Sequence, residues 1–189
     1  MLTLQAEVRR HRRELNDLVD LSKKDLRILF REFKTPDSAR DGLLDVLPKF
    51  VATYGSAAAT LAADWYDDMR DLVDARGRFR AFPAELPDVG RTESLARWGV
   101  SPLYDATTPN FSASEALVAG GLQRIIADAS RQTTMGSSIQ DPSASGWSRE
   151  TAGGCAFCEM IAGRGEVFSE ATADFASHDN CQCSAVPAF

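Results

Sequence analysis

The sequence predicts an α+β protein that is mostly α, with long N-terminal helices followed by a small α+β module. Two observations lead to this fold class. Apolar residues recur at three- and four-residue steps through most of residues 4–131, which is the spacing of amphipathic helices. All four cysteines and one of the two histidines lie between residues 155 and 183, in two close groups. Such grouping of soft ligands is typical of a structural zinc site, so we expect one zinc ion to staple the module.

Residues 1–34 are expected to form one long basic helix, because no glycine or proline interrupts the segment before Thr35-Pro36. Residues 35–135 are expected to form a helical domain, whose first helix covers 37–75 and ends at Gly77. Pro48 removes one backbone hydrogen bond from that helix, so we predict a kink or a break there.

Two shorter helices should complete the helical domain. The first covers residues 92–98, and the second begins between residues 109 and 114 and ends by Arg131. Ser112 is the predicted N-cap of the second helix, because Glu115 follows at the spacing of a capping box.

Residues 136–146 are rich in Gly, Ser and Pro and are predicted to form a polar linker. Residues 147–189 then form the Cys/His module. We expect one turn of helix at 159–162 and strands at 166–168 and 184–189.

The module offers five candidate ligands for a zinc ion that takes four. Gly153-Gly154 allows a tight turn before the first pair, so that two thiolates can face one ion. In the second group, positions 181 and 183 would share one face of an extended strand. We favour His178 over Cys183 for the fourth place, while a disulfide pair or reduced cysteines in a core remain open alternatives. The five candidates are Cys155, Cys158, His178, Cys181 and Cys183.

The net charge of −6 is unevenly distributed. Residues 1–34 hold nine Lys/Arg against six Asp/Glu, whereas residues 140–189 hold two Arg against seven Asp/Glu. A module that bound nucleic acid would need cations for the phosphates, so we interpret the metal as a structural staple.

No run of eighteen apolar residues is present, so we expect no membrane span. The N-terminus also lacks the apolar segment of a signal peptide. We therefore expect synthesis in a cytoplasm, where thiols stay reduced and metal binding is favoured over disulfides.

Two charged segments have alternative interpretations. The arginines at positions 9, 10, 12 and 13 could contact DNA phosphates or an acidic partner, but nearby acids also fit an ordinary solvated helix face. These residues are Arg9, Arg10, Arg12 and Arg13. Carboxylates at positions 64, 67, 68 and 71 share one helix face, and paired carboxylates can be catalytic. Neighbouring arginines could neutralise them, so a charged surface is favoured.

The sequence does not predict an enzyme or a small-molecule substrate. A hydrolytic zinc site keeps an open coordination position with a base beside it, whereas Cys and His ligands can fill this one. The chain has only His11 and His178, and it lacks the His-x-Glu of zinc deaminases.

The C-terminal motif resembles that of MuF-like minor head proteins of tailed phages, in particular the minor capsid or head-morphogenesis type carried by actinobacteriophages. The resemblance rests on Trp147-Ser-Arg149, Gly154-Cys155-Ala-Phe-Cys158 through Gly165, and His178-Asp-Asn-Cys181-Gln-Cys183 followed by Pro187. The helical half, including Tyr54 and residues 63–70, is similar to the N-terminal region of that family.

This resemblance implies a virion component that is made in the bacterial host cytoplasm and lies in the capsid interior at the portal vertex. Its implied partners are the portal protein, major capsid or scaffold proteins, and packaged DNA through the N-terminal helix. The implied roles are head assembly and DNA packaging or ejection. Some relatives carry a toxin or protease domain, and we expect neither here, because the chain starts at the long helix and ends shortly after Cys183.

Two other functions remain as alternatives. A zinc-dependent nucleic-acid-binding or nuclease module of a mobile element is disfavoured by the acidic residues 140–189. A host-directed effector injected with the DNA is disfavoured because no further domain follows the motif.

Overall fold

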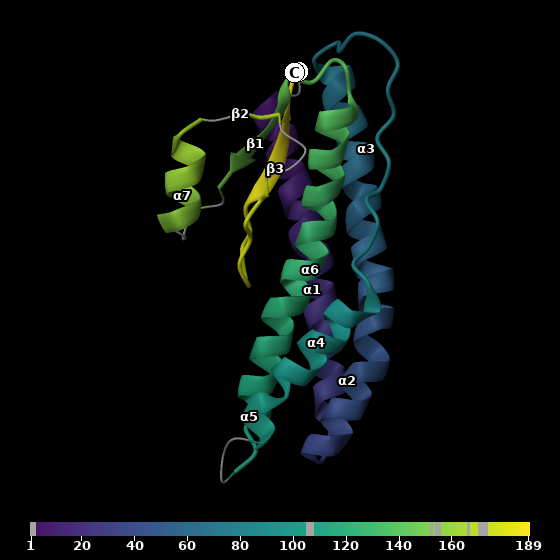
Figure 1. Cartoon of the computed structure of the whole chain (residues 1–189), viewed down its shortest axis with the longest axis vertical. Coiled ribbons are helices and arrows are strands. Elements are labelled where there is room, and N and C mark those ends of the chain that lie inside the picture. The colour runs from purple at the N-terminus through teal and green to yellow at the C-terminus, as the bar shows by residue number, and fades with distance from the viewer. Residues whose placement is uncertain (1–2, 105–107, 152, 154–155, 166, 170–173) are drawn as a thin grey trace.

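The computed structural model describes residues 3–104, 108–151, 153, 156–165, 167–169 and 174–189. It confirms a mostly α-helical α+β fold, in which long helices form an elongated bundle and a small sheet lies against one end of it (Figure 1).

Three helices form the centre of the bundle: α1 (Leu4–Glu32), α3 (Ser56–Leu72) and α6 (Phe111–Gln140). Helix α1 has 29 residues and α6 has 30, so each is about 45 Å long. The Thr3 side chain caps α1 by accepting a hydrogen bond from the Ala6 N–H. The buried apolar residues of α1 follow the predicted helical spacing; they are Val8, Leu15, Val19, Leu26 and Phe30.

The helix expected at residues 37–75 is interrupted but not broken. Helix α2 (Pro36–Phe50) continues into a π-helical segment, η1 (Val51–Gly55), which leads into α3. Pro48 has no N–H to donate to the carbonyl of Leu44, and the backbone widens three residues later. The irregularity predicted from Pro48 is therefore present as a π segment.

The prediction that Gly77 ends this helix is wrong, because α3 ends at Leu72. Asp74 has a φ of 51°, and its N–H donates to the carbonyl of Asp71. The N–H of Ala75 donates to the carbonyl of Arg70. This is a Schellman cap with aspartate at the left-handed position, which Asp tolerates better than most residues.

Helix α4 (Val89–Gly99) is capped by Asp88, and the short α5 (Ser101–Tyr104) follows it. The predicted N-cap of the next helix is wrong. Helix α6 begins at Phe111, and the Asn110 side chain accepts the hydrogen bond from the Ala113 N–H, so Ser112 lies inside the first turn.

The prediction that this helix ends by Arg131 is also wrong. Helix α6 continues to Gln140, so residues 136–140 of the expected linker are helical and only 141–145 connect to the sheet. The Ser/Thr-rich segment stays helical because its hydroxyl groups donate to carbonyls four residues earlier. The bonds of Thr133 to Ala129, Thr134 to Ser130 and Ser138 to Thr134 are 2.8–3.2 Å long.

The sheet has the order β2-β1-β3, and both pairings are antiparallel. Its strands are β1 (Gly146–Glu150), β2 (Val167–Phe168) and β3 (Ser184–Ala188), and α7 (Ala156–Gly163) lies between β1 and β2 in the chain. Pro187 is tolerated in β3 because β3 is an edge strand.

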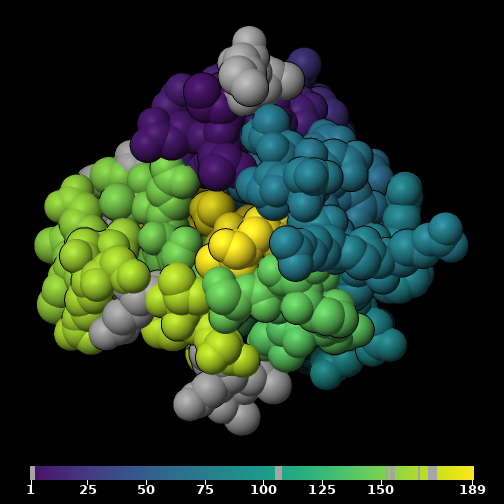
Figure 2. Space-filling model, turned by 90° about the horizontal axis from the view of Figure 1, so that it is seen from above, coloured from purple at the N-terminus to yellow at the C-terminus, as the bar shows by residue number. Residues whose placement is uncertain are grey.

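The two faces of the sheet meet different parts of the molecule. Val186 packs against Val8, Trp65 and Met69 of the bundle. Trp147 of β1 is on the face of the sheet opposite to Val186, because successive residues of a strand point to opposite faces. On that face Trp147 is part of a second core. This core consists of Met135, Trp147, Cys158, Phe175, Cys181, Cys183 and Ala185. Seen from the end of the bundle, the C-terminal strand lies at the centre, between the ends of α1, α3 and α6 (Figure 2).

A buried ion pair closes this end of the bundle. Arg70 of α3 donates to the carboxylate of Asp141, which directly follows α6 and is also the acceptor of the Tyr66 hydroxyl. The Asp141 side chain is 0% exposed and that of Arg70 is 7% exposed. The guanidinium also donates to the carbonyls of Arg76 and Gly77, so it fixes the loop after α3.

His11 occupies the interface of α1, α3 and α6. Its ring stacks on Trp65 with centroids 4.3 Å apart, and Nε2 is 3.1 Å from Oγ of Ser130. Burial, with the adjacent Arg10 and Arg12 charges, lowers the pKa of His11 to about 4. Within the described residues, no helix is both long and apolar enough to cross a bilayer.

We predict that Asp141→Ala lowers the free energy of unfolding by about 3 kcal/mol or more, because it leaves the buried Arg70 charge without its carboxylate. Urea denaturation would measure this loss. The matched control is Asp45→Ala, whose exposed pair with Lys49 should change stability by less than about 1 kcal/mol. Equal effects of the two substitutions would contradict the prediction.

We also predict that His11 makes the fold less stable in acid. The folded state holds this imidazole neutral down to about pH 4, whereas the unfolded chain takes up its proton near pH 6.5. The contribution is constant above pH 6.5 and falls by up to roughly 3 kcal/mol as the pH drops to 4. Denaturation of the wild type and of His11→Phe between pH 4 and 7 would isolate this difference, and parallel pH profiles would exclude it.

Candidate metal centre

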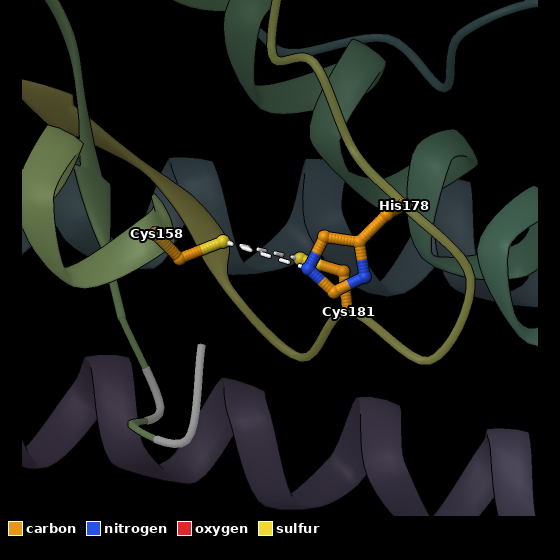
Figure 3. Close-up of side chains that lie close together, drawn as sticks. All are labelled: Cys158, His178 and Cys181. Atoms are coloured by element: carbon orange, nitrogen blue, oxygen red, sulfur yellow. Dashed lines mark hydrogen bonds between the residues drawn. The ribbon is translucent and has the colours of Figure 1, made fainter. Parts of the chain in front are cut away.

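Three side chains converge beside the sheet, at the second core to which Met135 of α6 also contributes. Cys158 comes from α7, whereas His178 and Cys181 come from the segment that precedes β3. Their ligand atoms lie within 4.8 Å of one another and could hold a metal ion (Figure 3). The carbonyl of His178 accepts a hydrogen bond from the Cys181 N–H, so a tight turn keeps the two ligands of this segment together.

The distances within the cluster suit coordination better than covalent pairing. The Sγ atoms of Cys158 and Cys181 are 3.8 Å apart, whereas a disulfide requires about 2.05 Å. Nε2 of His178 is 4.0 Å from Sγ of Cys158. Cys158 and Cys181 therefore do not form a disulfide, which the sequence had left as an alternative to a metal site.

The orientation of the imidazole also suits a ligand. Nδ1 of His178 lies 2.8 Å from the carbonyl oxygen of Asp179, which can only accept, so Nδ1 carries the proton. The lone pair is then on Nε2, which faces the sulfurs. Cys158 and Cys181 are buried, at 0% and 3% exposure, while His178 is on the solvent side.

The other two predicted ligands are not placed in this group. Cys155, and Gly154 of the predicted turn, lie outside the described residues. Cys183 is buried beside Cys181, but it falls outside the group of ligand atoms within 4.8 Å, and its Sγ is 3.7 Å from Oγ1 of Thr151.

The thiol of Cys181 needs a metal to ionise near neutral pH. Its hydrogen bond with Cys183, together with burial, raises the pKa of Cys181 to about 12. Metal binding must displace this proton, so affinity for a metal should fall as the pH falls.

Arg131 of α6 fixes the backbone that carries the second group of ligands. Its guanidinium donates to the carbonyls of Cys181 and Cys183 at 2.9–3.0 Å and pairs with Asp128 at 2.8 Å. The guanidinium also lies 4.7 Å from the ring centroid of Phe175. Our reading of the sequence missed this residue, because an arginine in a helix carries no signal of a partner fifty residues away.

Arg149 of β1 was also missed as a site residue. Its Nη1 is 3.4 Å from Sγ of Cys158, and its guanidinium lies 3.8 Å from the centroid of the Phe175 ring. The sequence could have indicated this position, because Arg149 is two residues after Trp147 and therefore shares a face of the strand with it.

The four arginines of the basic segment differ in their surroundings. Arg10 pairs with Glu7 and Asp68, each at 2.7 Å, and Arg12 reaches Glu150 of β1 at 3.5 Å. Arg9 and Arg13 are exposed. In the candidate acidic cluster, Asp68 is held by Arg10, and Asp67 pairs with Arg80 at 3.1 Å.

Comparison with known proteins identifies a family. The model of a protein family described as VG15 protein matches residues 2–189. No curated protein and no solved structure matches the chain.

We predict that each chain binds one divalent metal ion and that Cys158→Ser or Cys181→Ser removes it, because each loses a buried thiolate. Cys183→Ser should retain the ion, since its thiol lies outside the group. Elemental analysis of chain purified without chelator would measure the stoichiometry. If Cys183→Ser lost the metal ion and His178→Ala kept it, Cys183 and not His178 would be the fourth ligand.

Proposed function

The chain belongs to the VG15 protein family, a family of phage-associated proteins, and from this premise we propose that it is a structural minor capsid protein of the phage particle. In this proposal it docks on the portal inside the head and acts in head assembly and in DNA packaging or ejection. The observation that carries the proposal is the family match, which extends over nearly the whole chain and not over the cysteine motif alone.

We propose zinc as the ion of the metal centre. Thiolate and imidazole are the ligands of structural zinc. Two sulfurs bound to a tetrahedral zinc ion at about 2.3 Å lie roughly 3.8 Å apart, and the Sγ atoms of Cys158 and Cys181 have this separation. Cys155 is our candidate for the remaining place. Zinc would link α7 to the segment before β3, and the protein around the two buried sulfurs would keep solvent from them.

The long helices support a docking role. Leu21 and Ile28 of α1 are 48% and 51% exposed and are seven residues apart, so they share one helix face. An amphipathic helix can lay such a face into a groove of a partner, and we propose the portal protein as that partner. The exposed Arg9 and Arg13 would be available to packaged DNA or to an acidic portal surface.

The proposal predicts that purified particles contain the chain in few copies, with about one zinc ion per copy. Quantitative mass spectrometry against the portal and the major capsid protein would give the copy number. Elemental analysis of the particles would give the metal content. Abundant chain in infected cells with none in purified particles would overturn the proposal.

The docking surface can be tested in the same particles. Leu21→Glu combined with Ile28→Glu should sharply reduce incorporation while leaving the fold intact. The control is Val89→Glu combined with Trp98→Glu, which adds the same two charges at residues of α4 with 56% and 49% exposure and should be incorporated normally. Equal incorporation of both variants would exclude this face of α1 as the contact.

A further inference from the structure

Two buried arginines contact the same aromatic ring beside the metal centre but differ in how their charges are balanced. Arg131 is 2% exposed and has the carboxylate of Asp128 at 2.8 Å. Arg149 is 7% exposed, and within the described part of the chain no carboxylate lies within 4.0 Å of its guanidinium. The Nε atom of Arg149 also has no hydrogen-bond partner there.

A buried guanidinium remains charged at any pH that a protein tolerates, so it needs an anion nearby. The neighbouring Glu150 does not supply one, because it is on the opposite face of β1 and pairs with Arg12. The polar contact of Arg149 is instead Sγ of Cys158, at 3.4 Å from Nη1. A neutral thiol is a weak acceptor and carries no charge, whereas a metal-bound thiolate is a strong acceptor with negative charge.

We propose that Arg149 is the counter-cation of the metal centre, donating through Nη1 to the thiolate of Cys158 and balancing a net negative charge on the ion and its ligands. A divalent ion bound by three thiolates and one imidazole carries a net charge of −1, which one guanidinium neutralises. Two thiolates with neutral ligands would leave the centre uncharged. The buried charge of Arg149 therefore favours a third thiolate beside those of Cys158 and Cys181, and Cys155 is the cysteine proposed above for that place. This inference rests on the metal centre proposed above.

Arg149 acts on the ion through Cys158 and is thus a positioning residue. Its hydrogen bond withdraws charge from the sulfur, which makes the thiolate a poorer target for protons and oxidants and slows loss of the ion. The ring of Phe175 supports the guanidinium from 3.8 Å without supplying a full charge. The role therefore requires the positive charge of the side chain and not only its bulk.

The test uses the full-length chain loaded with zinc, in the wild type and in the variants Arg149→Met, Arg149→Lys and Phe175→Leu. Arg149→Met keeps most of the bulk without the charge, and we expect it to release zinc to an excess chelator about 10- to 100-fold faster than the wild type. Arg149→Lys restores the charge and should recover part of the difference. Phe175→Leu removes the ring but not the charge, so it is the matched packing control and should release zinc more slowly than Arg149→Met.

A second readout separates charge from packing. In the cobalt-substituted protein, the sulfur-to-metal charge-transfer band should move to lower energy in Arg149→Met, because the sulfur loses its hydrogen bond, and should stay in place in Phe175→Leu. If Arg149→Met does not fold, Arg149→Lys provides the same test. Its charge-transfer band should lie at lower energy than that of the wild type, but at higher energy than expected for a thiolate without a hydrogen bond.

The outcomes separate the two proposals. In one outcome the chain binds zinc, but Arg149→Met and Phe175→Leu release it at equal rates, or the charge-transfer band does not move in either Arg149 variant. Arg149 would then be a packing residue, and the proposal of a metal centre would be unaffected. A wild-type chain that binds no metal would overturn the metal centre itself, and the role of Arg149 with it.

Discussion

The contact between α6 and the cysteine-bearing segment holds the two halves of this molecule together. Helix α6 packs against α1 and α3 on one side and against β1 and β3 on the other. At the centre of the second contact, Arg131 binds the carbonyls of Cys181 and Cys183 while Asp128 balances its charge. The turn that presents His178 and Cys181 is therefore fixed from the bundle and not only by its own short segment. A metal ion would add a cross-link within a module that α6 already supports.

This arrangement favours a structural function for the centre. The two sulfurs of the described group are buried, the imidazole is oriented by a backbone carbonyl, and a cationic side chain faces one sulfur. An ion held in this way has protein around most of its coordination sphere. These features support the proposal made above that this member of the VG15 protein family is a structural component of the phage particle.

The sequence predicted those parts of the fold whose signal is local. The spacing of apolar residues identified α1 and the combined helix α2–η1–α3, and the cysteine spacing predicted that Cys158, His178 and Cys181 meet. Residues 132–140 of α6 escaped prediction because Ser and Thr there satisfy their hydroxyl groups within the helix, and their burial depends on segments distant in the sequence. Asp74 replaced the expected glycine in the cap after α3 because its strained backbone is stabilised by the Schellman bonds. The roles of Arg131 and Arg149 depend on distant partners, which a single sequence does not disclose.

The long, polar end of α6 has a consequence for how the molecule comes apart. Thr133, Thr134, Ser137 and Ser138 are poor helix formers, and their burial depends on other segments. Oγ1 of Thr133 accepts a hydrogen bond from the N–H of Ala84, in the segment between α3 and α4. The last two turns of α6 should therefore melt whenever that segment detaches, even if the rest of the bundle survives. Amide hydrogens in these turns would then exchange with solvent at the rate of residues 73–88, not at the rate of the helix to which they belong. A boundary between two cooperative units of this chain thus lies inside a helix.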